Sequence, residues 1–111
     1  MKSRWQVRLA QQARQDFSAI LTWTAEQFGA RQARTYGATL RSALKALADG
    51  PDIIGCRARD ELGPGLLSLH VARKGRKGRH FILLRAQGAT QTIEVLRILH
   101  DSMDLARHLE N

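Results

Sequence analysis

Residues 92–100 read Thr-Ile-Glu-Val-Leu-Arg-Ile-Leu-His, and this stretch decides the fold that the sequence predicts. It is rich in β-branched and aliphatic residues, which favours a strand. Two similar runs precede it, at 66–72 and 79–86. The segments between the runs, 73–78 and 87–91, both contain glycine. We therefore expect the three strands to form an antiparallel meander joined by hairpins.

The N-terminal part combines a strand with two helices. Apolar and polar side chains alternate over Trp5–Leu9, which is typical of a half-buried strand. Over 10–28 and 30–48 the apolar residues recur every three or four positions, which predicts two amphipathic helices. Gly29 is the only residue between them, and Gly50-Pro51 ends the second. The two helices should form an antiparallel hairpin.

The rest of the chain is expected to contain a loop and a short helix. The stretch 52–65 is punctuated by glycine and proline and predicts a loop. Asp101 is an N-cap candidate for a helix over 101–109. The prediction is an α+β domain spanning 1–111, of order β-α-α-β-β-β with a short C-terminal helix. Its helical hairpin packs on a mainly antiparallel four-stranded sheet.

The composition restricts the chemistry. The single cysteine, Cys56, allows no intrachain disulfide and no four-cysteine zinc site. No apolar run is long enough to cross a membrane, and the N-terminus has no apolar signal region. We therefore expect a cytoplasmic protein with no membrane contact and no cofactor. The net charge is +8. Between Arg57 and Arg85 eight basic residues oppose two acidic ones, so most of this charge lies in one stretch and points to an anionic partner.

Apolar residues occupy both faces of the expected sheet. By strict alternation, Ile93, Val95 and Leu99 would lie on one face of 92–100 and Leu96 and Ile98 on the other. A sheet with helices on one face and water on the other should be polar on its second face. The expected C-terminal helix would cover part of this second face, and a partner protein would cover the rest. The alternative is that the loop 52–65 covers it.

The histidines and the basic hairpin are candidates for ligand binding. His70 and His80 would be cross-strand neighbours if the turn between them were symmetric, but two ligands are too few to predict a metal site, so none is expected. The hairpin carries five cations in seven residues, whose mutual repulsion an anion would relieve. They are Arg73, Lys74, Arg76, Lys77 and Arg79. A solvated turn is the alternative.

Three motifs carry a family resemblance. Glu94-Val-Leu-Arg-Ile-Leu-His100 and the short segment after it resemble the closing strand and end of the RelE/ParE superfamily of toxins. Asp60-Glu-Leu-Gly-Pro-Gly-Leu66 is similar to the turn before the first meander strand of these toxins. Arg79-His-Phe-Ile-Leu-Leu-Arg85 resembles their central strand, which ends in arginine. The resemblance covers nearly the whole chain and favours a ParE-like toxin of a type II toxin–antitoxin pair.

The resemblance implies two alternative activities. ParE-like members poison DNA gyrase and have no catalysis of their own, which makes gyrase the expected target. RelE-like members cleave mRNA on the ribosome, and His100 and Arg85 would then be the catalytic residues. His100 also has a structural interpretation, as a strand-end residue that orders the turn at Asp101. Nucleic acid is a further possible ligand of the basic hairpin.

A cognate antitoxin is the partner that the resemblance implies in either case, and it would form a hetero-oligomer with this chain. Trp23 lies off the main apolar stripe of its helix, so it is either a protein contact or a core anchor. The residues expected to face the antitoxin are Trp23, Leu96, Ile98 and Met103.

Overall fold

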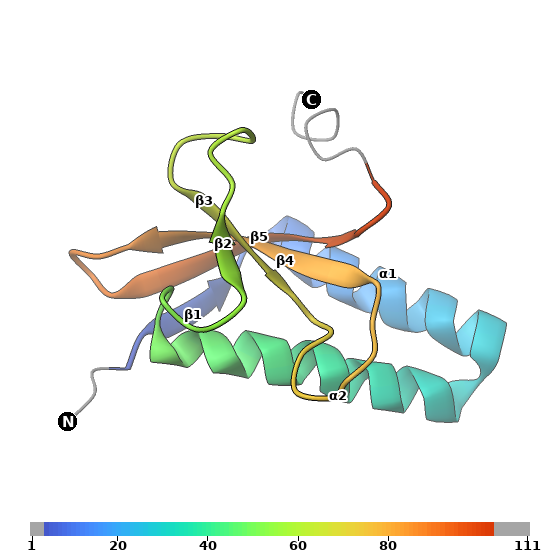
Figure 1. Ribbon diagram of the computed structural model, residues 1–111. Helices are drawn as coiled ribbons and strands as arrows, with labels where there is room; N and C mark the ends of the chain where they lie inside the picture. Colours follow the sequence, from blue (N-terminus) through green and yellow to red (C-terminus); the bar gives the residue numbers. More distant parts are fainter. Residues whose placement is uncertain (1–3, 104–111) are drawn as a thin grey trace.

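The computed structural model describes residues 4–103 and consists of two helices packed on one sheet (Figure 1). Helices and strands follow the predicted order, with one additional strand and a single turn of 3-10 helix, η1. The elements are β1 (Gln6–Leu9), α1 (Gln11–Phe28), α2 (Ala30–Ala46), η1 (Leu47–Asp49), β2 (Cys56–Ala58), β3 (Leu66–His70), β4 (His80–Gln87) and β5 (Thr92–His100).

The sheet has five strands in the order β1-β5-β4-β3-β2, so the expectation of four strands is wrong. The additional strand, Cys56–Ala58, lies in the stretch 52–65 that was expected to be a loop. Three residues are too few to show a period, and they form a strand only because Cys56 pairs with Leu69 and Ala58 with Leu67. The antiparallel meander is confirmed for β3, β4 and β5. β1 pairs with β5 in parallel.

The expected C-terminal helix over 101–109 is not seen at its start. Asp101 and Ser102 form a turn after β5, in which the Met103 N–H donates to the His100 carbonyl at 3.1 Å. The remainder of that helix, from residue 104, lies outside the described residues.

The predicted helical hairpin is confirmed, and it covers one face of the sheet. Figure 1 shows α1 and α2 side by side along the sheet. Gly29 joins them with a φ of 94°, in the region that glycine adopts most easily. The core between the helices and the sheet contains Ala13, Leu40, Ala43 and Leu47 from the helical part and Leu69, Ile82, Leu84, Ile93, Val95 and Ile98 from the strands.

Strand β5 has one residue more than its partner β4 over the same length. Val95 pairs with Leu84 and Arg97 pairs with Leu83, which leaves Leu96 without a partner in β4. This irregularity is a β-bulge. It reverses the alternation, so that Val95 and Ile98 both pack against the helices. Strict alternation placed them on opposite faces, and that expectation is wrong because no bulge was foreseen.

The second face of the sheet is covered by this chain itself. Phe81 and Leu99 form a small cluster there, against which Leu62 packs from the segment between β2 and β3. Leu83 of the same face is fully buried. The expectation that a partner protein covers these side chains is therefore wrong. The alternative, cover by the stretch 52–65, is confirmed for Leu62.

Candidate functional site

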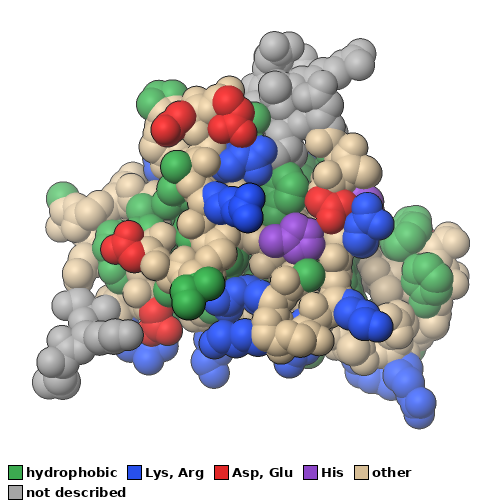
Figure 2. Space-filling model, viewed as in Figure 1, with side chains coloured by type: hydrophobic (Ala, Val, Ile, Leu, Met, Phe, Trp, Pro, Cys, Tyr) green, Lys and Arg blue, Asp and Glu red, His purple; other side chains and the backbone are tan. Residues whose placement is uncertain are grey.

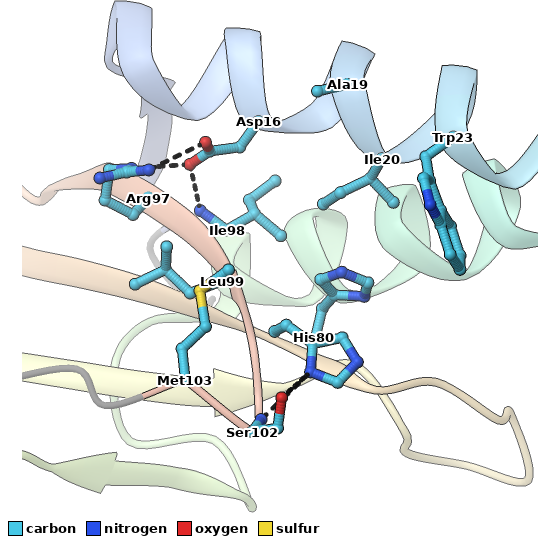
Figure 3. A pocket seen from close by; sticks show the side chains of 11 residues that line it. Asp16, Ala19, Ile20, Trp23, His80, Arg97, Ile98, Leu99, Ser102 and Met103 are labelled. Carbon is cyan, nitrogen blue, oxygen red and sulfur yellow. Dashed lines mark hydrogen bonds and ion pairs between the residues drawn. The ribbon is translucent and has the colours of Figure 1, made fainter. Parts of the chain in front are cut away.

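A groove of about 480 Å³ lies between α1 and the end of β5 (Figure 3). One wall comes from α1 and the other from β5 and the turn that follows it. Its middle is apolar, with Ala19 and Ile20 on the helix side and Leu99 and Met103 on the strand side. The groove therefore offers an accessible apolar surface beside the part of β5 that β1 does not cover, since the last β1 pair is Leu9 with Val95.

Three of the four residues expected to face an antitoxin meet at this groove. Trp23 and Met103 line it and expose 55% and 41% of their surface, whereas Ile98 lines it from below and is 3% exposed. Leu96, the bulge residue, is not part of the lining. That these side chains contact a partner stays a prediction.

One end of the groove is closed by an ion pair. The guanidinium of Arg97 donates to the Asp16 carboxylate from Nε at 2.8 Å and from Nη2 at 3.1 Å. The same carboxylate accepts the backbone N–H of Ile98 at 2.9 Å (Figure 3). That N–H lies at the uncovered edge of β5, so Asp16 satisfies a donor that would otherwise need water or another strand. The hydrogen bond to Asp16 raises the pKa of Arg97.

The other end of the groove is formed by His80 and its partners. The Tyr36 hydroxyl on α2 accepts the Arg79 backbone N–H at 3.1 Å. The same hydroxyl forms a hydrogen bond with His80 Nδ1, 2.6 Å away. Burial raises the pKa of Tyr36, which keeps the hydroxyl protonated for this role.

His80 is held neutral by its surroundings. Burial, and next the neighbouring His100, lower the pKa of His80 from 6.5 to about 4. The two rings meet edge to face with their centroids 5.2 Å apart. His100 Nδ1 accepts both the backbone N–H of Ser102 at 3.1 Å and its hydroxyl at 2.7 Å. His100 thus orders the turn after β5 by accepting hydrogen bonds from the backbone amide and the hydroxyl of Ser102.

The pair proposed for RNA cleavage, His100 and Arg85, is not assembled. His100 pairs with His80, and Arg85 is five residues further along β4. At about 3.4 Å per residue, the two positions are about 17 Å apart along the strand. Five is an odd number, so Arg85 and His80 lie on opposite faces of β4. One phosphate therefore cannot contact both Arg85 and His100.

His70 and His80 are not cross-strand partners either. His70 pairs with Phe81, so the turn between the strands is not symmetric. His70 lies on the face away from the helices, where its Nδ1 accepts the Ala72 N–H and its Nε2 donates to Asp101 at 3.0 Å. The two histidines face opposite sides of the sheet, which excludes a shared ligand between them.

The basic hairpin is partly bound to its own chain. Arg76 donates to the Thr39 hydroxyl at 3.3 Å, Arg79 donates to Asp101 at 3.0 Å and Arg73 donates to the Ile54 carbonyl at 3.3 Å. Lys74 and Lys77 are exposed. Three of the five cations therefore help to place the hairpin, and anion binding by the hairpin stays a prediction.

Sequence reasoning missed Asp16 and Tyr36 at the two ends of the groove. Asp16 is the only acidic residue in the first half of α1. The sequence does not show which strand edge this carboxylate faces, so its role could not be predicted. Tyr36 lies within the amphipathic helix predicted over 30–48, where its spacing indicates only a core position. Its hydroxyl acquires a role only because the β3–β4 hairpin folds onto α2.

Comparison with known proteins identifies relatives over almost the full length. Residues 7–105 match the family described as ParE toxin of type II toxin–antitoxin system, parDE. Toxin ParE1 of Mycobacterium tuberculosis is 36% identical over 109 residues, which is 98% of this chain and 100% of that protein. In the described part of this chain, no helix is long and apolar enough to cross a membrane.

Two solved structures have a similar fold. The first is a chromosomal ParDE system from P. aeruginosa, with a TM-score of 0.67 and 20% identity over 86% of this chain and 95% of that one. The second is the toxin–antitoxin complex RelBE2 from Mycobacterium tuberculosis, with a TM-score of 0.60 and 24% identity over 90% and 94%.

Replacing Asp16 with alanine should destabilise the protein by about 1–3 kcal/mol, because the Ile98 N–H and the Arg97 guanidinium both lose their acceptor. Glu26→Ala is the matched control, since it removes an exposed carboxylate from the same helix and should cost less than about 0.5 kcal/mol. Urea unfolding measures both. Equal effects would show that the Asp16 contacts contribute nothing.

Acidification should destabilise the protein through His80. Above pH 6.5 this side chain is neutral in both the folded and the unfolded chain. Between 6.5 and about 4 only the unfolded chain takes up the proton, so the free energy of unfolding falls as the pH falls through this range. His80→Gln keeps a hydrogen-bond partner for Tyr36 but does not titrate, so the stability of this variant should fall less steeply. Parallel pH profiles for the two proteins would contradict this assignment.

Proposed function

This chain belongs to the ParE family of toxins from type II toxin–antitoxin systems, and from this premise we propose that it inhibits growth by binding DNA gyrase. We propose further that a cognate antitoxin neutralises it by docking in the groove between α1 and β5. The observation that carries the first proposal is the match over almost the whole chain to toxins described as ParE. ParE-like toxins act on gyrase rather than on RNA.

The arrangement of the candidate catalytic residues supports a target-binding toxin over an mRNA endonuclease. An acid–base group and a phosphate-binding cation must reach the same phosphodiester. His100 of β5 pairs with His80 at the start of β4, whereas Arg85 lies five residues further along β4 and on the opposite face of the sheet. His100 is engaged with Ser102, and His80 beside it is neutral and bound to Tyr36.

The groove supports the proposal of an antitoxin partner. Its middle is apolar, and Trp23 and Met103 are among the few large apolar side chains that the described part of the chain exposes. A large exposed aromatic in a groove is the type of residue that anchors protein interfaces. Both similar solved structures come from toxin–antitoxin systems. We therefore expect the antitoxin to insert apolar side chains between α1 and β5.

A direct assay of the two targets tests the first proposal. The purified chain should inhibit DNA supercoiling by gyrase in a dose-dependent manner and should leave mRNA on translating ribosomes intact. The same supercoiling reaction with an excess of antitoxin should regain its activity. Cleavage of mRNA with unaffected gyrase would instead establish the endonuclease alternative.

Trp23→Ala should weaken antitoxin binding by about 2 kcal/mol or more, which corresponds to about 30-fold in Kd, because the side chain forms the outer wall of the groove. Phe28→Ala is the matched control, since Phe28 is 65% exposed and stacks edge to face on Trp23 but does not line the groove. Titration calorimetry with the cognate antitoxin measures both. If the two variants lose equal affinity, the helical hairpin tip rather than the groove is the docking site.

A further inference from the structure

A second cavity, of about 450 Å³, lies on the face of the sheet that the helices do not cover. It is lined by residues of β2 and β3, by the start of the β3–β4 hairpin, by Phe81 of β4 and by Asp101. Figure 2 shows Lys and Arg side chains around a histidine on the face that carries β2 and β3. None of the groove residues described above lines this cavity.

Three arginines from three segments of the chain line this cavity. Arg57 lies on β2, Arg59 directly after β2, and Arg73 at the start of the hairpin. Arg59 is paired with the exposed Glu61 at 2.8 Å, whereas Arg57 and Arg73 have no carboxylate partner among the described residues. The tertiary structure therefore concentrates positive charge that the protein itself only partly neutralises.

One arginine of the lining, Arg59, is held in place by its neighbours. The Arg59 guanidinium lies over the ring of Phe81, with 5.7 Å between its central carbon and the ring centroid. It also donates to the hydroxyl of Ser68 at 3.3 Å, and Ser68 is 6% exposed. Stacking and hydrogen bonding fix the plane of this guanidinium before any ligand arrives, which lowers the entropic cost of binding.

The only acidic residue of the lining is already engaged. Asp101 accepts hydrogen bonds from His70 Nε2 at 3.0 Å and from Arg79 Nε at 3.0 Å. The Asp101 carboxylate thus binds His70 and Arg79 and is not paired with Arg57, Arg59 or Arg73. The interior is left with a surplus of positive charge and of N–H donors.

We propose that this cavity is a binding site for a phosphate group, carried by a ligand of about nucleotide size. A single carboxylate offers two oxygens and is satisfied by one guanidinium fork. A phosphate offers three oxygens and up to two charges, which suits a cavity lined by several arginines. The volume exceeds the need of a bare ion and lies in the range of small-molecule sites. The phosphate group belongs either to a free nucleotide or to a nucleic-acid strand.

Calorimetric titration of the full chain in phosphate-free buffer tests this site. The probes are adenosine 5′-monophosphate, adenosine, inorganic phosphate and a short single-stranded RNA. Adenosine 5′-monophosphate should bind and adenosine should not. Arg57→Ala and Arg73→Ala should each weaken binding by about tenfold or more. Arg57 is exposed, so Arg57→Ala should leave the melting temperature unchanged. Arg34→Ala removes the same charge from the exposed surface of α2 and should have little effect.

The probes also separate the two sources of the phosphate group. Similar affinities for the mononucleotide and the RNA indicate a free nucleotide, whereas tighter and strongly salt-dependent binding of the RNA indicates a strand. The proposal is overturned if no phosphorylated probe binds better than adenosine. It is also overturned if Arg34→Ala weakens binding as much as Arg57→Ala, since the effect would then be one of net charge. The outcome is independent of the gyrase assay, because it measures binding by the chain alone.

Discussion

The bulge at Leu96 determines which face of the sheet every later residue of β5 occupies. Leu96 has no partner in β4, so the alternation after it is reversed and Ile98 joins the core beneath the helices. His100 consequently lies on the helix side, next to His80, and Leu99 lies on the opposite side with Phe81. Without this extra residue neither the groove nor the small second core would have its present lining. Bulges are frequent at functional sites because they redirect side chains in this way.

The turn after β5 serves both faces of the molecule. His100, Ser102 and Met103 line the groove beside α1, whereas Asp101 lines the arginine cavity. Asp101 also connects strand β3 to the hairpin, since it accepts hydrogen bonds from His70 and from Arg79. A short turn therefore fixes the relative position of two surfaces that are otherwise built from different segments of the chain.

The positively charged side chains do not all extend into solvent, because several arginines bind to groups of the protein itself. Arg97 is bound by Asp16, and the arginines of the hairpin donate to a hydroxyl, a carbonyl and a carboxylate of the protein. Arg57 and Arg73 in the cavity on the second face have no carboxylate partner among the described residues. Long-range electrostatics attracts any anion to this protein, whereas the planar guanidinium groups that line one cavity can select an anion by its geometry.

The sequence by itself determined the helices, the antiparallel meander and the family, because periodicity and local motifs depend on neighbouring residues. It also pointed to Trp23, Ile98 and Met103, which the structure brings to one groove. Only the tertiary structure decided the short strand β2, the bulge at Leu96 and the register that separates Arg85 from His100. Strand pairing and register depend on hydrogen bonds and packing between distant segments. For that reason Asp16, Tyr36 and Arg59 acquired a role only when the chain was folded.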